Sequence, residues 1–261
     1  MTQAPAEAPL RRTRRRRRRP RATVTSVLGE LLLTAGVVVL LFVAWQMWIG
    51  DIIIGAASNE KGNQLSQQWA AAPVPAAPPK VADPAKPDAP PQYEPPLMTA
   101  PGDAELFAVM KIPRFGPDYA VEIHGGVTRP NTLDHGWIGL YPQSKMPGQV
   151  GNFSMAGHRT TWGAPFNKLD KLHLNDPIVV ETEQGWYTYR FRTLEYVTPD
   201  QIDVLADVPQ LPGTVTGERY ITLTACSPLY SLAERIIAYG VFEGFQPRAD
   251  GAPASLTEGV H

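Results

Sequence analysis

Residues 219–242 read RYITLTACSPLYSLAERIIAYGVF, and this stretch decides the fold class of the C-terminal part of the chain. Two runs rich in β-branched and aromatic residues, 219–225 and 236–242, flank a connection that contains Pro228. Such runs are typical of β-strands. Because proline cannot donate to a sheet ladder, we expect the chain to leave the sheet just after Cys226. The stretch therefore predicts two strands, with Cys226 at the end of the first.

Similar short runs precede this pair. The other predicted strands are Leu106–Ile112, Tyr119–Ile123, Asn152–Ala156, Pro177–Thr182 and Trp186–Phe191. Gly, Pro, Asn and Asp turns separate them, and no sustained helical periodicity occurs in this part of the chain. The pattern predicts an all-β domain, either a closed or nearly closed antiparallel barrel or a sandwich.

The N-terminal part has a different character. Residues 1–22 carry nine arginines and one glutamate, a net charge of +8, so the remaining residues sum to −9 in a chain of net charge −1. The 20 residues 31–50 are uncharged and mostly apolar, with Trp45 and Trp48 near their end. That length spans a bilayer core of roughly 30 Å. The positive-inside rule then predicts a cytoplasmic N-terminus and an extracytoplasmic domain.

Two alternatives for this region are weaker. A basic run is also typical of nucleic-acid binding, but membrane topology explains it without a further assumption, so we expect no nucleic-acid partner. Gly55-Ala-Ala resembles a signal-peptidase site. The apolar stretch is longer than the roughly 7–15 residues of a signal peptide, which favours an uncleaved anchor in the plasma membrane.

Composition also predicts the segment boundaries. Residues 73–96 hold 10 prolines in 24 positions, which is typical of an extended, semi-rigid spacer. Residues 51–72 are polar and are compatible with either a short helix or a stalk. We predict the following order: cytoplasmic tail 1–26, transmembrane anchor 27–54, Ala/Pro-rich linker 55–102, globular domain 103–246 and disordered tail 247–261.

Three side chains of the predicted domain suggest thiol chemistry. Cys226 is the only cysteine, so an intramolecular disulfide is impossible and the thiol is either an intermolecular link, a reactive group or an inert core residue. His158 also ends a predicted strand, and the small Ala156 and Gly157 before it leave room for a substrate. Arg235 returns to the level of Cys226 if their strands are antiparallel neighbours. A nucleophile, a proton-transfer group and a cation are what thiol acyl transfer requires.

Local motifs add a family resemblance. Thr222-Leu-Thr-Ala-Cys226 resembles the TLxTC signature of sortases, and YSLAERII at 230–237 resembles their arginine segment. GHRTTWGAPF at 157–166 resembles the histidine motif of class E sortases of actinobacteria. The order His, Cys, Arg matches, and the resemblance covers roughly residues 103–246. One departure is Ala225, where the family usually has threonine, so a hydroxyl that could position substrate is absent.

The resemblance implies a cysteine transpeptidase on a closed, eight-stranded antiparallel β-barrel that anchors surface proteins at the cell wall. Cys226 would attack between Thr and Gly of an LAxTG or LPxTG sorting signal and form a thioester. His158 would be the general acid and base, and Arg235 would stabilise the oxyanion. An amine of a lipid II stem peptide or a pilin lysine would release the product. No cofactor or metal is implied, and Glu181 and Glu183 are expected on a solvated face.

The remaining histidines and aromatic residues of the predicted domain give weaker indications of function. His124 and His135 are expected at turns or at the barrel rim, with a contribution to the substrate groove left open. His173 is expected at the surface, and Trp137, Tyr141 and Trp162 are expected to pack at the barrel or its rim. Two other functions stay open. An L,D-transpeptidase lacks a matching motif around Cys226, and Ala225 favours a non-catalytic sortase-like assembly protein.

Overall fold

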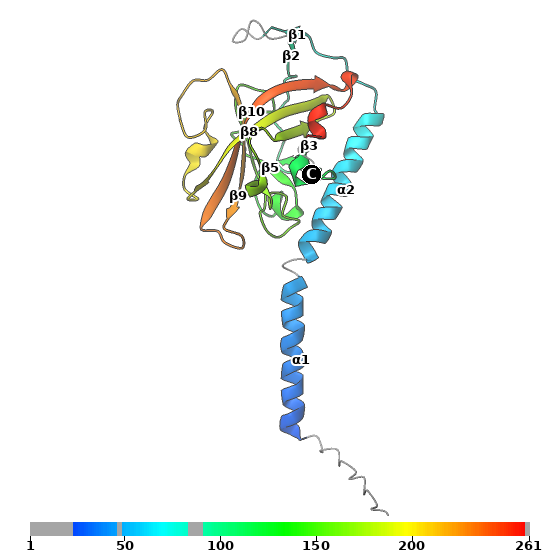
Figure 1. Ribbon diagram of the computed structural model, residues 1–261, viewed down its shortest axis with the longest axis vertical. Helices are drawn as coiled ribbons and strands as arrows, with labels where there is room; N and C mark the ends of the chain where they lie inside the picture. Colours follow the sequence, from blue (N-terminus) through cyan, green and yellow to red (C-terminus); the bar gives the residue numbers. More distant parts are fainter. Residues whose placement is uncertain (1–22, 46–48, 83–90, 259–261) are drawn as a thin grey trace, which may run out of the picture. The chain divides into compact units, whose positions relative to one another are not determined.

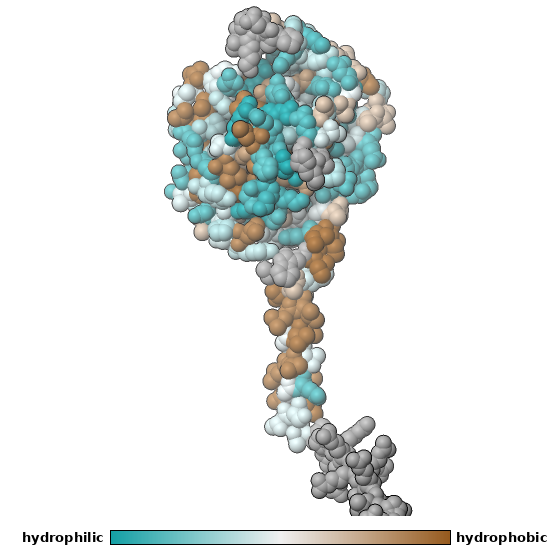
Figure 2. All heavy atoms as spheres, in the orientation of Figure 1, coloured by the Kyte–Doolittle hydropathy of each residue, from teal (hydrophilic) through white to brown (hydrophobic). Residues whose placement is uncertain are grey.

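The computed structural model describes residues 23–45, 49–82 and 91–258, so the arginine-rich block and Trp48 lie outside the described residues. The chain forms two compact units, residues 1–44 and 45–261. Helix α1 (Val24–Ala44) belongs to the first. It is the one helix in the described ranges that is long and apolar enough to cross a membrane, with a mean hydropathy of 2.5. Figure 2 shows apolar side chains along this helix.

The second unit begins with helix α2 (Gly50–Ala71), which packs on the barrel (Figure 1). Ser66 donates to a carboxylate oxygen of Glu181 at 2.7 Å, and Asn63 donates to the carbonyl of Asp118 at 3.0 Å. A Cβ on Gly62 would lie 2.2 Å from the carbonyl oxygen of Ala120. Helix α2 therefore covers the end of the predicted anchor (27–54) and the first part of the predicted linker (55–102). Its barrel-facing side is polar and small, so it lacks the apolar stripe that identifies an amphipathic helix in a sequence.

The proline-rich segment is only partly a spacer. Two short strands, β1 (Lys80–Val81) and β2 (Gln92–Tyr93), pair antiparallel, and the Tyr187 hydroxyl donates to the carbonyl of Pro96 at 3.2 Å. Contact with the barrel thus begins before the predicted boundary at residue 103.

Eight strands close the barrel in the order β10-β8-β7-β3-β4-β5-β6-β9 (Figure 1). Their bounds are β3 Leu106–Lys111, β4 Val121–Gly125, β5 Ile138–Leu140, β6 Gly151–Ala156, β7 Pro177–Glu181, β8 Gly185–Val197, β9 Arg219–Ser227 and β10 Glu234–Pro247. The 3-10 turns are η2 Pro113–Phe115, η3 Leu133–His135, η4 Leu169–Lys171, η5 Ile202–Leu205, η6 Arg248–Asp250 and η7 Ala254–Leu256.

The closed all-β barrel confirms the predicted architecture, but the sheet is mixed. The β4–β5 and β6–β9 pairs are parallel, whereas an entirely antiparallel barrel was expected. A parallel pair needs a long crossover connection. The chain between β6 and β9 contains β7 and β8 as such a crossover, and local turn signals do not reveal it.

Alternation along β6 and β9 separates the core from the outer face of the barrel wall. On β9, Ile221, Leu223 and Ala225 belong to the hydrophobic core. The residues between them point outward, and the hydroxyl of Thr222 donates to Asn152 of β6 at 2.8 Å. Cys226 continues this outward series.

The predicted disordered tail is folded as far as it is described. The buried Arg248 donates to Glu181 at 2.9 Å, and its guanidinium lies 4.7 Å from the ring centroid of Trp186. The hydroxyls of Ser255 and Thr188 lie 3.2 Å apart. Glu181 is therefore a buried ion-pair partner and not part of a solvated face. These contacts with distant segments explain why the small, polar residues of the described C-terminal segment, 247–258, are ordered.

Candidate active site

The parallel pairing of β6 with β9 brings His158 and Cys226 to the same level. Ala156 is the register partner of Thr224, and the backbone N–H of Gly157 donates to the Thr224 carbonyl at 3.1 Å. His158 and Cys226 each lie two residues beyond that pair. Opposed residues of neighbouring strands lie on the same face. Both half-buried residues therefore lie just beyond that pair, at the same end of the two strands.

Arg235 lies on the other side of Cys226. The two residues are direct register partners in the antiparallel β9–β10 pair, which confirms that Arg235 returns to the level of the thiol. Its Nη1 donates to the carbonyls of Leu232 and Glu234, at 3.2 and 2.9 Å. These two bonds tie the guanidinium to the β9–β10 connection, and Cys226, the register partner of Arg235, is half-buried.

Asp134 is a site residue that the motifs did not indicate. It lies in η3, and its Oδ1 accepts a hydrogen bond from Nε2 of His158 at 2.8 Å and another from Nε of Arg129 at 3.2 Å. Burial by itself raises the pKa of Asp134, but the hydrogen bonds from His158 and Arg129 bring that pKa below its ordinary value. Asp134 is thus an anionic acceptor that orients the imidazole. The Asp134-His135-Gly turn shows a polar loop, but nothing in its sequence indicates His158 as its partner.

The residues that follow His158 and Cys226 are also connected. Arg159 is 7% exposed and donates through Nη1 to the hydroxyl of Ser227 at 3.0 Å. Its Nη2 lies 3.7 Å from Oδ1 of Asp170. This buried bridge fixes the two strand ends relative to each other, and so fixes the spacing of the imidazole and the thiol.

Two small residues have a different role from the one expected. A Cβ on Gly157 would lie 2.7 Å from the ring of Phe166, so the space beside it is filled by the protein and not left for a substrate. Ala225 is 4% exposed and packs in the core, opposite to the face of Cys226. Its missing hydroxyl is therefore a matter of core packing and not of the outer site.

Tyr141 is closer to the site than expected for simple packing. Its hydroxyl lies 3.0 Å from that of Thr224, on the face that carries Cys226. Burial raises the pKa of Tyr141, while the bond with Thr224 and the charge of Arg235 partly oppose this increase. The phenol therefore stays neutral and remains a hydrogen-bonding group beside the thiol.

His124 and His135 pack against Trp137, and His173 is exposed as expected. His124 is buried, with Nδ1 3.0 Å from the carbonyl of Ala104 and Nε2 3.3 Å from Glu122. Trp137 stacks with both His124 and His135, at centroid distances of 3.7 and 4.5 Å. Within the described segments, no cluster of three His, Cys, Asp or Glu side chains could hold a metal ion.

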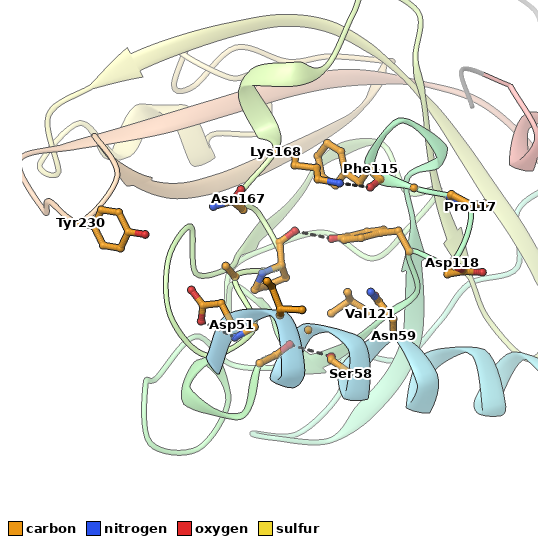
Figure 3. Close-up of a pocket in the computed structure, with 18 residues that line it drawn as sticks. Asp51, Ser58, Asn59, Phe115, Pro117, Asp118, Val121, Asn167, Lys168 and Tyr230 are labelled. Carbon is orange, nitrogen blue, oxygen red and sulfur yellow. Dashed lines mark hydrogen bonds between the residues drawn. The ribbon is translucent and has the colours of Figure 1, made fainter. Parts of the chain in front are cut away.

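A pocket of about 590 Å³ lies between α2 and the barrel (Figure 3). Its wall includes the loop after His158 and Tyr230 from the β9–β10 connection, but neither His158 nor Cys226. Two bonds cross it, from the Tyr119 hydroxyl to the Pro165 carbonyl at 2.9 Å and from Lys168 Nζ to the Phe115 carbonyl at 2.5 Å. The pocket is therefore adjacent to the candidate site and separate from the reacting groups.

Comparisons with known proteins place this geometry in context. The model of the Sortase domain family matches residues 110–243. The chain is 35% identical over 266 aligned positions to Sortase SrtE1 of Streptomyces coelicolor, covering 97% of this chain and 68% of that protein.

Solved sortase structures are also similar to this chain. Sortase E1 from Streptomyces coelicolor, crystallised with a tripeptide in its active site, matches with a TM-score of 0.55 and 36% identity, covering 60% of this chain and 99% of that one. The SrtA sortase from Actinomyces oris matches with a TM-score of 0.59 and 32% identity, covering 62% and 93%.

Proposed function

Because the chain belongs to the sortase family of transpeptidases, we propose that it cleaves a C-terminal LAxTG- or LPxTG-type sorting signal through Cys226 and transfers the acyl group to an amine. One observation supports this assignment most strongly. Arg235 is the register partner of Cys226, and His158 and Cys226 each follow the Ala156–Thr224 register pair by two residues. Thiol acyl transfer needs this combination of groups within reach of one carbonyl.

In the first half-reaction, the Cys226 thiolate adds to the carbonyl carbon of the Thr–Gly bond. The guanidinium of Arg235 stabilises the negative charge that develops on the carbonyl oxygen. The tetrahedral intermediate expels the glycine amine, which takes a proton from His158. A thioester between threonine and Cys226 remains.

In the second half-reaction, an incoming amine adds to the thioester carbonyl and loses a proton to His158. The thiolate of Cys226 leaves and a new amide bond forms. Lipid II stem peptides and pilin lysines are the acceptor amines that we propose. Asp134 keeps the imidazole oriented through both halves, because it bonds the ring nitrogen Nε2.

We further propose that α1 anchors the enzyme in the plasma membrane, with the N-terminus in the cytoplasm and the barrel at the cell wall. The apolar composition of α1 and the arginine-rich block before it support this orientation. Cys226 is the only cysteine of the chain. A membrane-impermeant maleimide should therefore label this protein in intact cells, and only at Cys226. Labelling only after lysis would contradict the orientation.

The catalytic proposal can be tested with the full chain in detergent micelles. We expect an LAxTG or LPxTG peptide to give a thioester adduct on Cys226 in mass spectrometry, and addition of triglycine to convert the adduct to a ligated peptide. Cys226→Ala should give neither product. An unmodified wild-type Cys226 with both peptides would instead favour a non-catalytic protein on a sortase scaffold.

A further inference from the structure

We propose that α2 is part of the catalytic apparatus, because its first turns hold the loop that carries His158, with Asp51 as a positioning residue. This inference rests on the proposed function. It assigns a role to a helix that precedes the matched family domain, which begins at residue 110.

The contact starts at the carboxylate of Asp51. Its Oδ2 accepts a hydrogen bond from the backbone N–H of Thr161 at 2.8 Å, and its Oδ1 accepts one from the N–H of Gly163 at 3.3 Å. Both donors belong to the segment directly after His158. A carboxylate that accepts two backbone N–H groups forms charge-assisted bonds, which are stronger than neutral ones.

The backbone held in this way is unusual. Four successive residues, Thr161 to Ala164, have positive φ angles of 66°, 54°, 80° and 46°. Three of them are not glycine, and such residues rarely adopt this conformation unless their surroundings impose it. The two bonds to Asp51 are a part of those surroundings that comes from outside the barrel.

The same helix also contacts the loop of Asp134. The hydroxyl of Ser58 donates to the Gly136 carbonyl at 3.2 Å, two residues beyond Asp134. A Cβ on Gly55 would lie 3.1 Å from the Gly163 carbonyl oxygen, so the helix backbone approaches the histidine loop closely. Figure 3 shows Asp51 and Ser58 on the helix that borders the pocket. One helix thus contacts both loops that form the Asp134–His158 pair.

A consequence for catalysis follows from the geometry. Proton transfer depends steeply on the position of the acid and base, and a shift of about 1 Å can lower a rate up to about 100-fold. If α2 only stabilised the barrel, loss of Asp51 would lower the melting temperature and leave the turnover of folded enzyme unchanged. If α2 positions His158, kcat falls while KM for the sorting peptide stays constant.

The test compares full-length variants in detergent micelles. Asp51→Ala should speed amide hydrogen exchange at Thr161 and Gly163 and lower kcat about tenfold, with KM unchanged. Asp51→Asn keeps one acceptor oxygen and should restore part of kcat. The matched control is Glu60→Ala, which removes an equal charge from an exposed position of α2 and should behave as wild type.

A second variant does not alter the carboxylate. Gly55→Leu inserts a side chain between α2 and Gly163 and should lower kcat by a similar factor. Wild-type kcat in both Asp51→Ala and Gly55→Leu, or a loss that only follows the unfolded fraction, overturns the proposal. An inactive wild-type chain would overturn the proposed function instead, and the exchange rates at Thr161 and Gly163 would still decide whether Asp51 holds the loop.

Discussion

Strand alternation places Cys226 and its neighbour Ala225 on opposite faces of the barrel wall. Ala225 packs in the core against neighbours such as the fully buried Ile236, whereas Cys226 lies on the outer face beside Arg235. The sequence motif showed the departure at position 225, but only the barrel shows which side of the wall that position faces. A single-residue difference within the motif therefore concerns stability more than substrate.

Ala225→Thr restores the residue usual in the family and tests this point. We expect a loss of about 1–3 kcal/mol in the free energy of unfolding, because a hydroxyl enters the apolar core. Turnover of the folded enzyme should not change. Thermal melting combined with peptide turnover checks both, and a faster enzyme of unchanged stability would contradict this placement.

Arg235→Lys keeps the positive charge but loses the planar guanidinium. The guanidinium can bond the Leu232 and Glu234 carbonyls through Nη1 and still direct its other N–H groups to a substrate oxygen, whereas an ammonium has its three donors on a single nitrogen. We expect kcat to fall about 10²-fold, as for loss of one oxyanion donor, with little change in melting temperature. Arg192→Lys, on the exposed part of β8, is the matched control and should retain full turnover.

At the scale of elements, β9 and β10 were predictable because each is rich in β-branched and aromatic residues and the motifs span their connection. Cys226 and Arg235 were proposed for the same reason, whereas His158 was proposed from its own motif at the end of β6. Asp134 was not, since it reaches His158 only through the parallel β4–β5 pair and the antiparallel β5–β6 pair, which local patterns do not encode. Helix α2 was left open because its contacts with the barrel are polar or use glycine.

The bridge between β6 and β9 gives a prediction at this scale. Arg159→Ala removes the bond to Ser227 and the contact with Asp170. We expect a loss of about 2 kcal/mol, or about 4–8 °C in melting temperature. Because the strand ends also set the spacing of His158 and Cys226, turnover should fall in the enzyme that remains folded. A variant with wild-type melting temperature would show that the bridge is dispensable.

For the whole second unit, one ion pair gives a pH dependence. Arg114 donates two 2.8 Å bonds to Asp176, which joins η2 to the loop before β7. Burial by itself raises the pKa of Asp176, but the bonds from Arg114 and the His173 amide bring it below its ordinary value. The pair therefore stabilises the fold fully above the unfolded pKa of about 3.9, and this contribution is lost as pH falls through the lower folded value.

Asp176→Asn should remove this dependence. Between about pH 4 and 2, the melting temperature of the wild type should fall more steeply than that of the variant, because only the wild type must protonate the paired carboxylate. Near neutral pH the variant should be less stable, since it has lost the charge-assisted bonds. Parallel slopes for the two proteins at low pH would show that other carboxylates dominate acid unfolding.

The parallel β6–β9 pair also bears on the order in which the molecule becomes active. His158 and Cys226 are far apart in sequence, and β7 and β8 lie between them. Long-range pairing is slow, because the entropy of closing the intervening loop must be overcome first. The thiol and the imidazole therefore meet only when the barrel closes. The chain therefore has no assembled pair of Cys226 and His158 until its folding is nearly complete.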